Sequence, residues 1–320
     1  MNEVILVCGA GGFIGGHLIG EIRKTCEQPI RAVDIKPFAE WHQLHIGVEN
    51  VQLDLRDSVS CEMAMRGVDC AHNLACDMGG IGFIETHKAD CMLSVLINTN
   101  LLRYAMGVSR YFFASSACVY NADNQDDEKA IPLSEYMAYP AKPESGYGWE
   151  KLFSERMCMH FKEDYGIETR VARFHNVYGP HGTYKGGREK APAAICRKIA
   201  MARITGKREI EIWGDGEQTR SFMWIGDALT GIYRITQSSN YMPINLGSSE
   251  LVSINRLVDI VEEIAGIKCK RSYNMKAAQG VRGRNSDNTR IRELFDWEPS
   301  TPLKIGLEKT YAWIYDQLIK

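Results

Sequence analysis

Three glycines between an apolar segment and a helical pattern constrain the fold of this chain more than any other feature. Gly9, Gly12 and Gly15 form the pattern G-x-x-G-x-x-G directly after an apolar run. Glycines at this spacing permit a tight turn and leave the helix N-terminus open to a pyrophosphate. A turn that only caps a helix is the alternative, but the flanking strand and helix patterns favour a dinucleotide site. We expect the cofactor contacts to come from Gly9, Gly12, Phe13, Ile14 and Gly15.

Strand patterns alternate with helical patterns through the first 180 residues of the chain. Apolar residues recur at helical spacing over 85–107, which predicts one long helix, and again over 146–166. The alternation predicts an α/β fold built on a doubly wound parallel sheet with helices on both faces. The first predicted strand lies before the glycines in the stretch that starts at residue 3, and the others cover 29–36, 49–57, 68–75 and 109–116, with a sixth in 167–180 that runs into a loop.

The pattern changes after Pro180, where a polar, glycine-rich stretch is followed by helices and short strands without regular alternation. We therefore expect a smaller, mixed α/β C-terminal domain that binds the substrate. The first domain is predicted to hold residues 1–175 plus about 221–247, because the segment after Arg220 resembles a return to the main sheet. The second is predicted to hold about 176–220 plus 248–320.

The charge balance excludes several classes of partner. Lys and Arg number 38 against 40 Asp and Glu, a formal net charge of −2, so nothing attracts the whole chain to nucleic acid or to acidic membranes. The ten cysteines show no zinc-site spacing, which predicts no metal and suits the reducing cytoplasm. No apolar run reaches the length of a membrane span, and no secretory leader is recognisable at the start.

Two carboxylates stand at predicted strand ends. Asp34 lies 19 residues beyond Gly15, where a carboxylate accepts hydrogen bonds from ribose hydroxyls and repels a 2′-phosphate. This position favours NAD over NADP, although Lys36 works against the preference. Asp54 ends the third strand and is interpreted either as a contact to the adenine edge or as a neighbour of a helix N-cap.

Tyr147 and Lys151 form the strongest catalytic pattern from residue types alone. Four-residue spacing puts both side chains on one face of a helix. An ammonium beside a phenol favours the phenolate, which can accept the proton of an alcohol. A surface pair on an amphipathic helix is the alternative. Ser115 and Ser116 end the strand expected beside this helix, and a Ser–Tyr–Lys set near a nicotinamide is a hydride-transfer site.

The chain resembles the extended short-chain dehydrogenase/reductase family. The resemblance extends from the glycine turn through "SSACVY", "YGWEK", "RFHNVYGP" and "RSFMWIGD" to "VRGRNSDN". It implies a Rossmann fold, NAD as cofactor, a nucleotide-sugar substrate and a homodimer joined through two helices of each subunit. "NLACDMGGIGFI" and "HNVYGPHGTYKGGREKAPAAICRK" narrow it to epimerases of a GDP-hexose. The implied reaction inverts C3 and C5 through a 4-keto sugar, from GDP-D-mannose to GDP-L-galactose and GDP-L-gulose.

Cys118 distinguishes this chain from related dehydratases. The resembling strand end of those enzymes carries Asp-Glu, where this chain has Ala117 and Cys118. Without a carboxylate, removal of a hydroxyl group is disfavoured, whereas a thiol can exchange a carbon-bound proton next to a ketone. Inversion needs a second group on the opposite face of the sugar, and the resemblance implies Lys190. The alternatives are a buried apolar cysteine and a solvated loop lysine.

The resemblance also implies the remaining substrate contacts. Gly79 would line the sugar pocket, Asn176 would hold the sugar–phosphate region, and Arg220 and Arg282 would clamp the diphosphate. Lys185, Arg188 and Arg284 are interpreted as exposed loop charges. The full set of expected substrate contacts is Gly79, Ser115, Ser116, Cys118, Asn176, Glu189, Lys190, Ala191, Lys198, Gln218, Thr219, Arg220 and Arg282.

Two other functions stay open from the sequence. One is an NAD-dependent nucleotide-sugar epimerase with a different sugar or base, since Asn121 and Tyr184 depart from the family pattern. The other is a nucleotide-binding regulatory module that has lost turnover. The intact Ser–Tyr–Lys set and Cys118 argue against the second.

Overall fold

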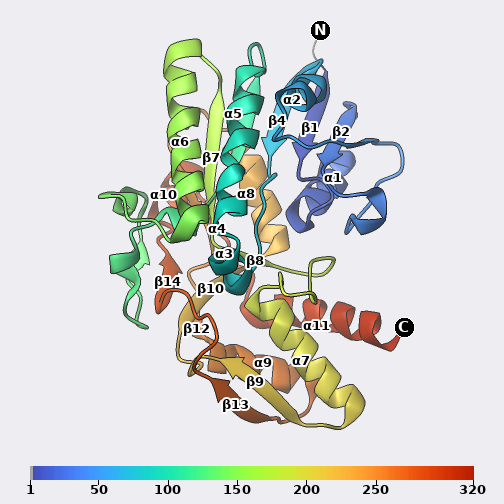
Figure 1. Cartoon of the computed structure of the whole chain (residues 1–320), viewed down its shortest axis with the longest axis vertical. Helices are drawn as coiled ribbons and strands as arrows, with labels where there is room; N and C mark the ends of the chain where they lie inside the picture. The colour runs from blue at the N-terminus through green and yellow to red at the C-terminus, as the bar shows by residue number, and fades with distance from the viewer. Residues whose placement is uncertain (1–2) are drawn as a thin grey trace.

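The computed structural model describes residues 3–320. Its main feature is a seven-stranded sheet in which every neighbouring pair is parallel (Figure 1). The central strands are buried on both faces, as expected for a parallel sheet between helical layers. In spatial order the strands are β11 (Ile244–Leu246), β7 (Thr169–Phe174), β5 (Arg110–Ser116), β4 (Val68–Asn73), β1 (Val4–Cys8), β2 (Ile30–Asp34) and β3 (Glu49–Gln52).

Helices cover both faces of this sheet, which confirms the doubly wound prediction. On one face, α1 (Phe13–Thr25) and α8 (Ile225–Gln237) bury an apolar cluster against the strands. On the other face, α2 (Ser58–Met65), α5 (Val95–Arg103) and α6 (Ser145–Tyr165) bury a second cluster. Figure 1 shows α5 and α6 side by side along the sheet.

The direction of strand addition reverses at β1. From β1 the chain adds β2 and β3 on one side, and then β4, β5, β7 and β11 on the other. A crevice forms outside the carboxyl ends of the strands at such a switch point, and ligands bind there in open α/β sheets. The glycine turn after β1 lies in this place. A Cβ added to Gly9 would lie 2.9 Å from the backbone nitrogen of Ala75, directly after β4.

The single helix predicted over 85–107 is wrong, because the segment forms three helices. They are α3 (Ile81–Thr86), α4 (Lys88–Leu93) and α5. His87 has φ −124° and ψ 46°, which interrupts the helical backbone. Ser94 separates α4 from α5, and its hydroxyl accepts a hydrogen bond from the backbone N–H of Asp77 at 2.9 Å. The helical periodicity persists because each short helix still buries one apolar face.

The C-terminal part of the chain forms a separate apolar core. Helices α7 (Ala191–Thr205), α9 (Ile254–Ala265) and α11 (Leu303–Ile319) pack together beside a small parallel sheet of β9 (Glu209–Trp213) and β13 (Lys270–Asn274). In Figure 1 this group lies below the main sheet.

Another sheet joins the two parts of the molecule. Its order is β12 (Leu251–Ser253), β10 (Thr219–Trp224), β14 (Gly283–Ser286) and β6 (Pro132–Leu133), with β8 (Asn176–Tyr178) also paired to β10. Helix α10 (Thr289–Phe295) follows β14 in the chain. Short 3-10 turns occupy Phe38–Glu40, Ala117–Val119, Ala122–Gln125 and Glu135–Ala138.

We keep the two-domain division as a proposal. It is supported by β11 and α8, which belong to the main sheet and its helical layer although they follow the first segment of the second domain, about 176–220, in sequence.

Candidate active site

The end of β5 presents two serines that have different surroundings. The Ser116 hydroxyl accepts a hydrogen bond from the backbone N–H of Cys118 at 3.2 Å. The Ser115 hydroxyl instead donates to Glu155, a buried carboxylate that is ion-paired with Arg173. Successive side chains of a strand point to opposite faces. Ser116 therefore lies with Cys118, whereas Ser115 is engaged inside the protein.

Tyr147 and Lys151 are both buried on the first turns of α6. The Lys151 ammonium nitrogen lies 5.5 Å from the centre of the Tyr147 ring, so the four-residue spacing does bring the two side chains together. Burial raises the pKa of Tyr147 well above its ordinary value, and the Ser116 hydroxyl opposes this by hydrogen bonding. The lowered pKa that the sequence predicts for Tyr147 is therefore not found, because burial has the largest effect.

Lys151 keeps its charge despite its burial. Burial alone would lower the pKa of Lys151, but the nearby Cys76 and Glu150 outweigh it and the net pKa is raised. The Glu150 carboxylate lies 3.6 Å from the ammonium, and both side chains are almost fully buried. The Lys151 ammonium is therefore a fixed positive charge beside the Tyr147 ring, and it stabilises any negative charge that develops on the phenol oxygen.

Arg284 is the main residue that the sequence analysis placed wrongly. It was predicted to be an exposed loop charge, yet only 7% of it is exposed. One guanidinium nitrogen, Nη1, lies 3.5 Å from Cys118 Sγ, and the others bond Gln125 and Glu144. The segment becomes the buried strand β14 between β10 and β6. Two-residue alternation places Arg282 and Arg284 on the same side, so the sequence offered no signal that separates them.

Cys118 and Lys190 are brought to the same cluster from distant segments. Lys190 precedes α7, and its loop is anchored where the N–H of Gly80 donates to the carbonyl of Arg188 at 3.0 Å. Burial raises the pKa of Cys118, with Arg284 opposing. Burial lowers the pKa of Lys190, with Cys118 opposing. Both shifts favour the uncharged forms, a thiol and an amine.

The loop before Lys190 packs closely against the Gly79–Gly80 turn. A Cβ added to Gly80 would lie 2.5 Å from the carbonyl oxygen of Glu189, and one added to Gly79 would lie 2.8 Å from Cβ of Phe83. The Glu189 carboxylate is held by Arg197 on α7 at 3.0 Å. A side chain at Gly80 would therefore displace the loop that carries Lys190, and one at Gly79 would displace Phe83 on α3.

The glycine turn and Asp34 form a cradle that fits a dinucleotide. Gly9 has φ +76°, and a Cβ added to Gly15 would lie 2.2 Å from the carbonyl oxygen of Gly9. Gly12 caps α1, which leaves backbone N–H groups directed at the crevice. The buried Asp34 carboxylate accepts from the N–H groups of Gly11 and Lys36, both at 3.0 Å. The carboxylate is thereby fixed beside the turn.

Asp54 has a local partner. Its carboxylate binds Arg56 at 2.7 Å, and hydrogen bonding from Arg56 lowers the pKa of Asp54. The N-cap of α2 is Asp57, which accepts from the N–H of Ser60. Asp54 is thus three residues before the cap, as the N-cap-neighbour interpretation has it, and its adenine contact stays a prediction.

The residues expected to bind the diphosphate and nucleotide gather around β10. The Arg220 guanidinium donates to the carbonyls of Thr219, Gln279 and Val281, and burial together with Arg284 lowers the pKa of Arg220 to about 10. Arg282 is ion-paired with both Asp215 and Glu128, so its charge is already balanced.

Four other expected substrate contacts, one lysine and three uncharged residues, donate hydrogen bonds to backbone carbonyls of the protein. Lys198 donates to the carbonyl of Glu211, Thr219 to that of Glu128, and Asn176 to that of Ser221. Gln218 donates to Trp213, while its Oε1 is buried without a hydrogen-bond partner. That unsatisfied oxygen suits a donor from a bound molecule.

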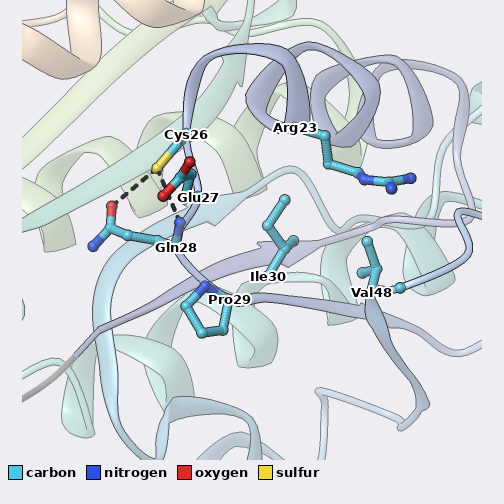
Figure 2. Close-up of a pocket in the computed structure, with 8 residues that line it drawn as sticks. Arg23, Cys26, Glu27, Gln28, Pro29, Ile30 and Val48 are labelled. Atoms are coloured by element: carbon cyan, nitrogen blue, oxygen red, sulfur yellow. Dashed lines mark hydrogen bonds between the residues drawn. The ribbon is translucent and has the colours of Figure 1, made fainter.

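A surface pocket lies away from this cluster. Figure 2 shows it lined by Arg23, Cys26, Glu27, Gln28, Pro29, Ile30 and Val48. These residues surround the amino end of β2, whereas ligands of open α/β sheets bind at the carboxyl ends. The pocket is therefore not the candidate site.

Two structural tests apply to the described residues. Within residues 3–320, no group of three or more His, Cys, Asp or Glu side chains is placed to hold a metal ion. Over the same range, every helix is too short or too polar to span a membrane.

Comparison with known proteins agrees with the geometry. The profile of the NAD dependent epimerase/dehydratase family matches residues 5–247. The chain is 43% identical to GDP-mannose 3,5-epimerase 1 of Oryza sativa subsp. japonica, over 99% of this chain and 82% of that protein. It is 42% identical to GDP-mannose 3,5-epimerase of Arabidopsis thaliana, over 100% of this chain and 84% of that protein.

Solved structures share the fold. UDP-glucose 4-epimerase of Thermotoga maritima superposes with a TM-score of 0.87 at 23% identity, covering 98% of this chain and 99% of that one. MoeE5, solved with UDP-glucose and NAD, gives a TM-score of 0.81 at 27% identity, covering 98% and 99%. The resemblance inferred from the sequence is confirmed: with its Rossmann sheet, glycine cradle and Ser–Tyr–Lys cluster, the chain belongs to the NAD dependent epimerase/dehydratase family.

Proposed function

We propose that the protein epimerises GDP-D-mannose at C3 and C5 through a 4-keto sugar, yielding GDP-L-galactose and GDP-L-gulose. The observation that carries this proposal is the meeting of Cys118 and Lys190 beside Tyr147 and Ser116. A simple 4-epimerase needs only the hydroxyl set, whereas inversion at C3 or C5 needs further proton-transfer groups. The plant relatives, which are named as GDP-mannose 3,5-epimerases, support the same substrate.

Tyr147 and Lys151 would act at C4. The glycine turn and Asp34 would hold NAD, and the bound nicotinamide would supply the acceptor for the C4 hydride. The phenol oxygen of Tyr147 exchanges the proton of the 4-hydroxyl, and the Lys151 charge stabilises the phenolate that this requires. Ser116 is placed to hydrogen-bond Tyr147 and the same sugar oxygen.

Cys118 and Lys190 would act at the carbons that flank the ketone. A carbonyl at C4 acidifies the C–H bonds at C3 and C5, so an amine or a thiolate can remove those protons. Since burial favours the free amine of Lys190 and the protonated thiol of Cys118, we assign Lys190 to removal of the proton and Cys118 to its delivery on the other face. Each inversion leaves Lys190 protonated and Cys118 as the thiolate. A proton must then pass from the lysine to the cysteine, directly or through solvent, before the next inversion.

The direct test is the reaction in deuterated water. GDP-D-mannose is incubated with the NAD-loaded protein, and NMR locates deuterium in the recovered sugars. We expect deuterium at C5 and C3 of inverted products and none at C4, where the original hydride returns. Deuterium-free sugar inverted at C4 alone, or turnover of a UDP-hexose in place of GDP-D-mannose, would replace the proposed reaction by the alternative epimerase.

We propose that Asp34 sets the preference for NAD. In Asp34→Ala we expect the ratio of NADP to NAD dissociation constants to fall by about 10-fold or more, because a charged hydrogen bond to ribose and the repulsion of a 2′-phosphate are both lost. Cofactor titrations followed by tryptophan fluorescence measure the ratio. Asp54→Ala in the same assay tests the role of Asp54. Weaker binding of both cofactors would indicate an adenine contact, and unchanged binding would indicate that Asp54 only pairs with Arg56. An unchanged ratio in Asp34→Ala would mean that the ribose contact is misassigned.

We propose that the protein is a homodimer. Apolar side chains on α4, α5 and α6 stay exposed: Met92 at 47%, Leu96 at 40%, Trp149 at 47% and Phe153 at 53%. A contiguous apolar surface of this kind marks an interaction site. Sedimentation velocity at micromolar concentration tests the proposal, and a monomer mass would contradict it.

We also propose that the protein works in the cytoplasm. All ten cysteines are free, including Cys118, and thiols persist in a reducing compartment.

A further inference from the structure

Glu144 is a carboxylate at the centre of the candidate site to which neither the sequence analysis nor the proposed reaction gives a role. It is the N-cap residue of α6, three positions before Tyr147. Its backbone N–H donates to the carbonyl of Cys118 at 3.0 Å. Its side chain is 15% exposed and bonds Arg284 at 2.7 Å. The same residue therefore touches the turn that carries the thiol and the cation that faces the thiol.

Arg284 is held in one orientation by its neighbours. Nε donates to Oε1 of Gln125 at 2.6 Å, and Nη2 donates to Oε2 of Glu144. With these two nitrogens fixed, the third, Nη1, is presented to Cys118 Sγ at 3.5 Å. Gln125 is itself 1% exposed and donates to backbone carbonyls of its own turn, so it cannot follow a shift of the guanidinium.

The charges around Cys118 oppose one another. Arg284 lowers the pKa of the thiol, whereas Glu144 raises it in the same direction as burial. An unpaired guanidinium this close to a buried thiol would favour the thiolate strongly. The charged and titratable groups that face Cys118 come from several elements: Arg284 on β14, Glu144 at the N-cap of α6, Tyr147 on α6, Lys190 before α7 and Arg220 on β10. Cys76, after β4, faces Tyr147, Lys151 and Lys190.

We propose that Glu144 is a positioning residue for proton transfer by Cys118: its carboxylate orients Arg284 toward the sulfur and balances the guanidinium charge, so that the resting thiol keeps its proton. This inference rests on the proposed function, because it gives Glu144 a purpose in the inversion steps and none in hydride transfer. The ion pair also explains why an acidic side chain is tolerated near a nucleotide-sugar diphosphate, because Arg284 compensates the charge of the carboxylate.

The test separates charge from shape. Cys118 is alkylated with iodoacetamide in the NAD-saturated protein from pH 6 to 10, and mass spectrometry of its peptide gives the rate at each pH. In Glu144→Gln we expect the midpoint of the rate curve to fall by about one pH unit, so that alkylation at pH 7 becomes roughly tenfold faster. Glu144→Asp keeps the charge and is expected to keep the wild-type midpoint. A change in access alone would alter the plateau rate and leave the midpoint in place.

Glu262→Gln is the matched control. Glu262 is a buried carboxylate that pairs with Arg271 on the far side of the C-terminal core, at 3.0 Å. Its loss reports the general effect of breaking a glutamate–arginine pair, and we expect no shift of the Cys118 midpoint. An unshifted midpoint in Glu144→Gln, or an equal shift in Glu144→Asp or Glu262→Gln, overturns the proposal.

A second readout links the variant to the reaction. With GDP-D-mannose in deuterated water, Glu144→Gln should incorporate deuterium several-fold more slowly at pH 7, while formation of NADH from the sugar continues. Equal losses of both would indicate general damage and contradict a role confined to Cys118. If the wild-type protein does not act on GDP-D-mannose, the proposed function fails, but the alkylation curves need no sugar and still decide whether Glu144 controls the thiol.

Discussion

Tyr147→Phe is expected to abolish epimerisation while NAD still binds. In the proposed reaction the phenol oxygen exchanges the 4-hydroxyl proton, and without the 4-keto sugar neither C3 nor C5 becomes acidic. A positioned acid/base group typically contributes about 100- to 10,000-fold, and here every later step depends on it. NMR of GDP-D-mannose in deuterated water should show neither new sugars nor deuterium, and cofactor titration should give a dissociation constant close to that of the wild type.

Tyr311→Phe supplies the matched control for this variant. Tyr311 is another buried tyrosine, in the C-terminal core, and its hydroxyl has no hydrogen-bond partner in the described structure. Removing that hydroxyl should leave turnover unchanged. Near-normal epimerisation by Tyr147→Phe would remove Tyr147 from the mechanism.

Cys118→Ala should separate the two halves of the chemistry. In the proposed reaction, oxidation at C4 uses Tyr147 and Lys151 and needs no thiol, so the variant should bind the GDP-hexose and form some NADH with a 4-keto sugar. Proton exchange at C3 or C5 should fall by about 100- to 10,000-fold. Absorbance at the NADH band and deuterium incorporation by NMR measure the two halves separately. Cys118→Ser should be nearly as poor, because a hydroxyl is far less acidic than a thiol.

Cys196→Ala controls for the loss of a buried cysteine as such. Cys196 is fully buried among apolar residues of the C-terminal core, and its removal should change stability without touching exchange. Wild-type deuterium exchange in Cys118→Ala would reduce Cys118 to a packing residue, and the epimerase would need another base.

The sequence predicts those features that local patterns determine. The turn at Gly9–Gly15 needs small residues at fixed spacing, and the parallel strands are continuous apolar runs, so both are readable without the structure. Tyr147 and Lys151 are likewise predictable because helix geometry alone places them on one face.

The features that escape prediction depend on contacts between distant segments. The segment 85–107 is interrupted at His87, whose backbone is not helical, and no periodicity reveals this. Arg284 is buried because β14 inserts between β10 and β6, strands separated from it by more than 50 residues of sequence. Ser115 and Ser116 are adjacent and chemically identical, and their different partners, Glu155 for Ser115 and the Cys118 N–H for Ser116, come from the folded structure.

The interleaving of strands has a consequence for how this architecture can change its substrate. β11, at one edge of the main sheet, comes after β10 in sequence, while β6, which precedes α6, pairs in the sheet that joins the two parts. A cut near residue 175 would remove both β11 and the helix α8 that seals one face of the main sheet, leaving apolar strand surface open to water. The substrate-binding part therefore cannot be exchanged as an independent cassette. New sugar specificities have to arise by substitution within loops that both parts hold in place, such as the loop before Lys190.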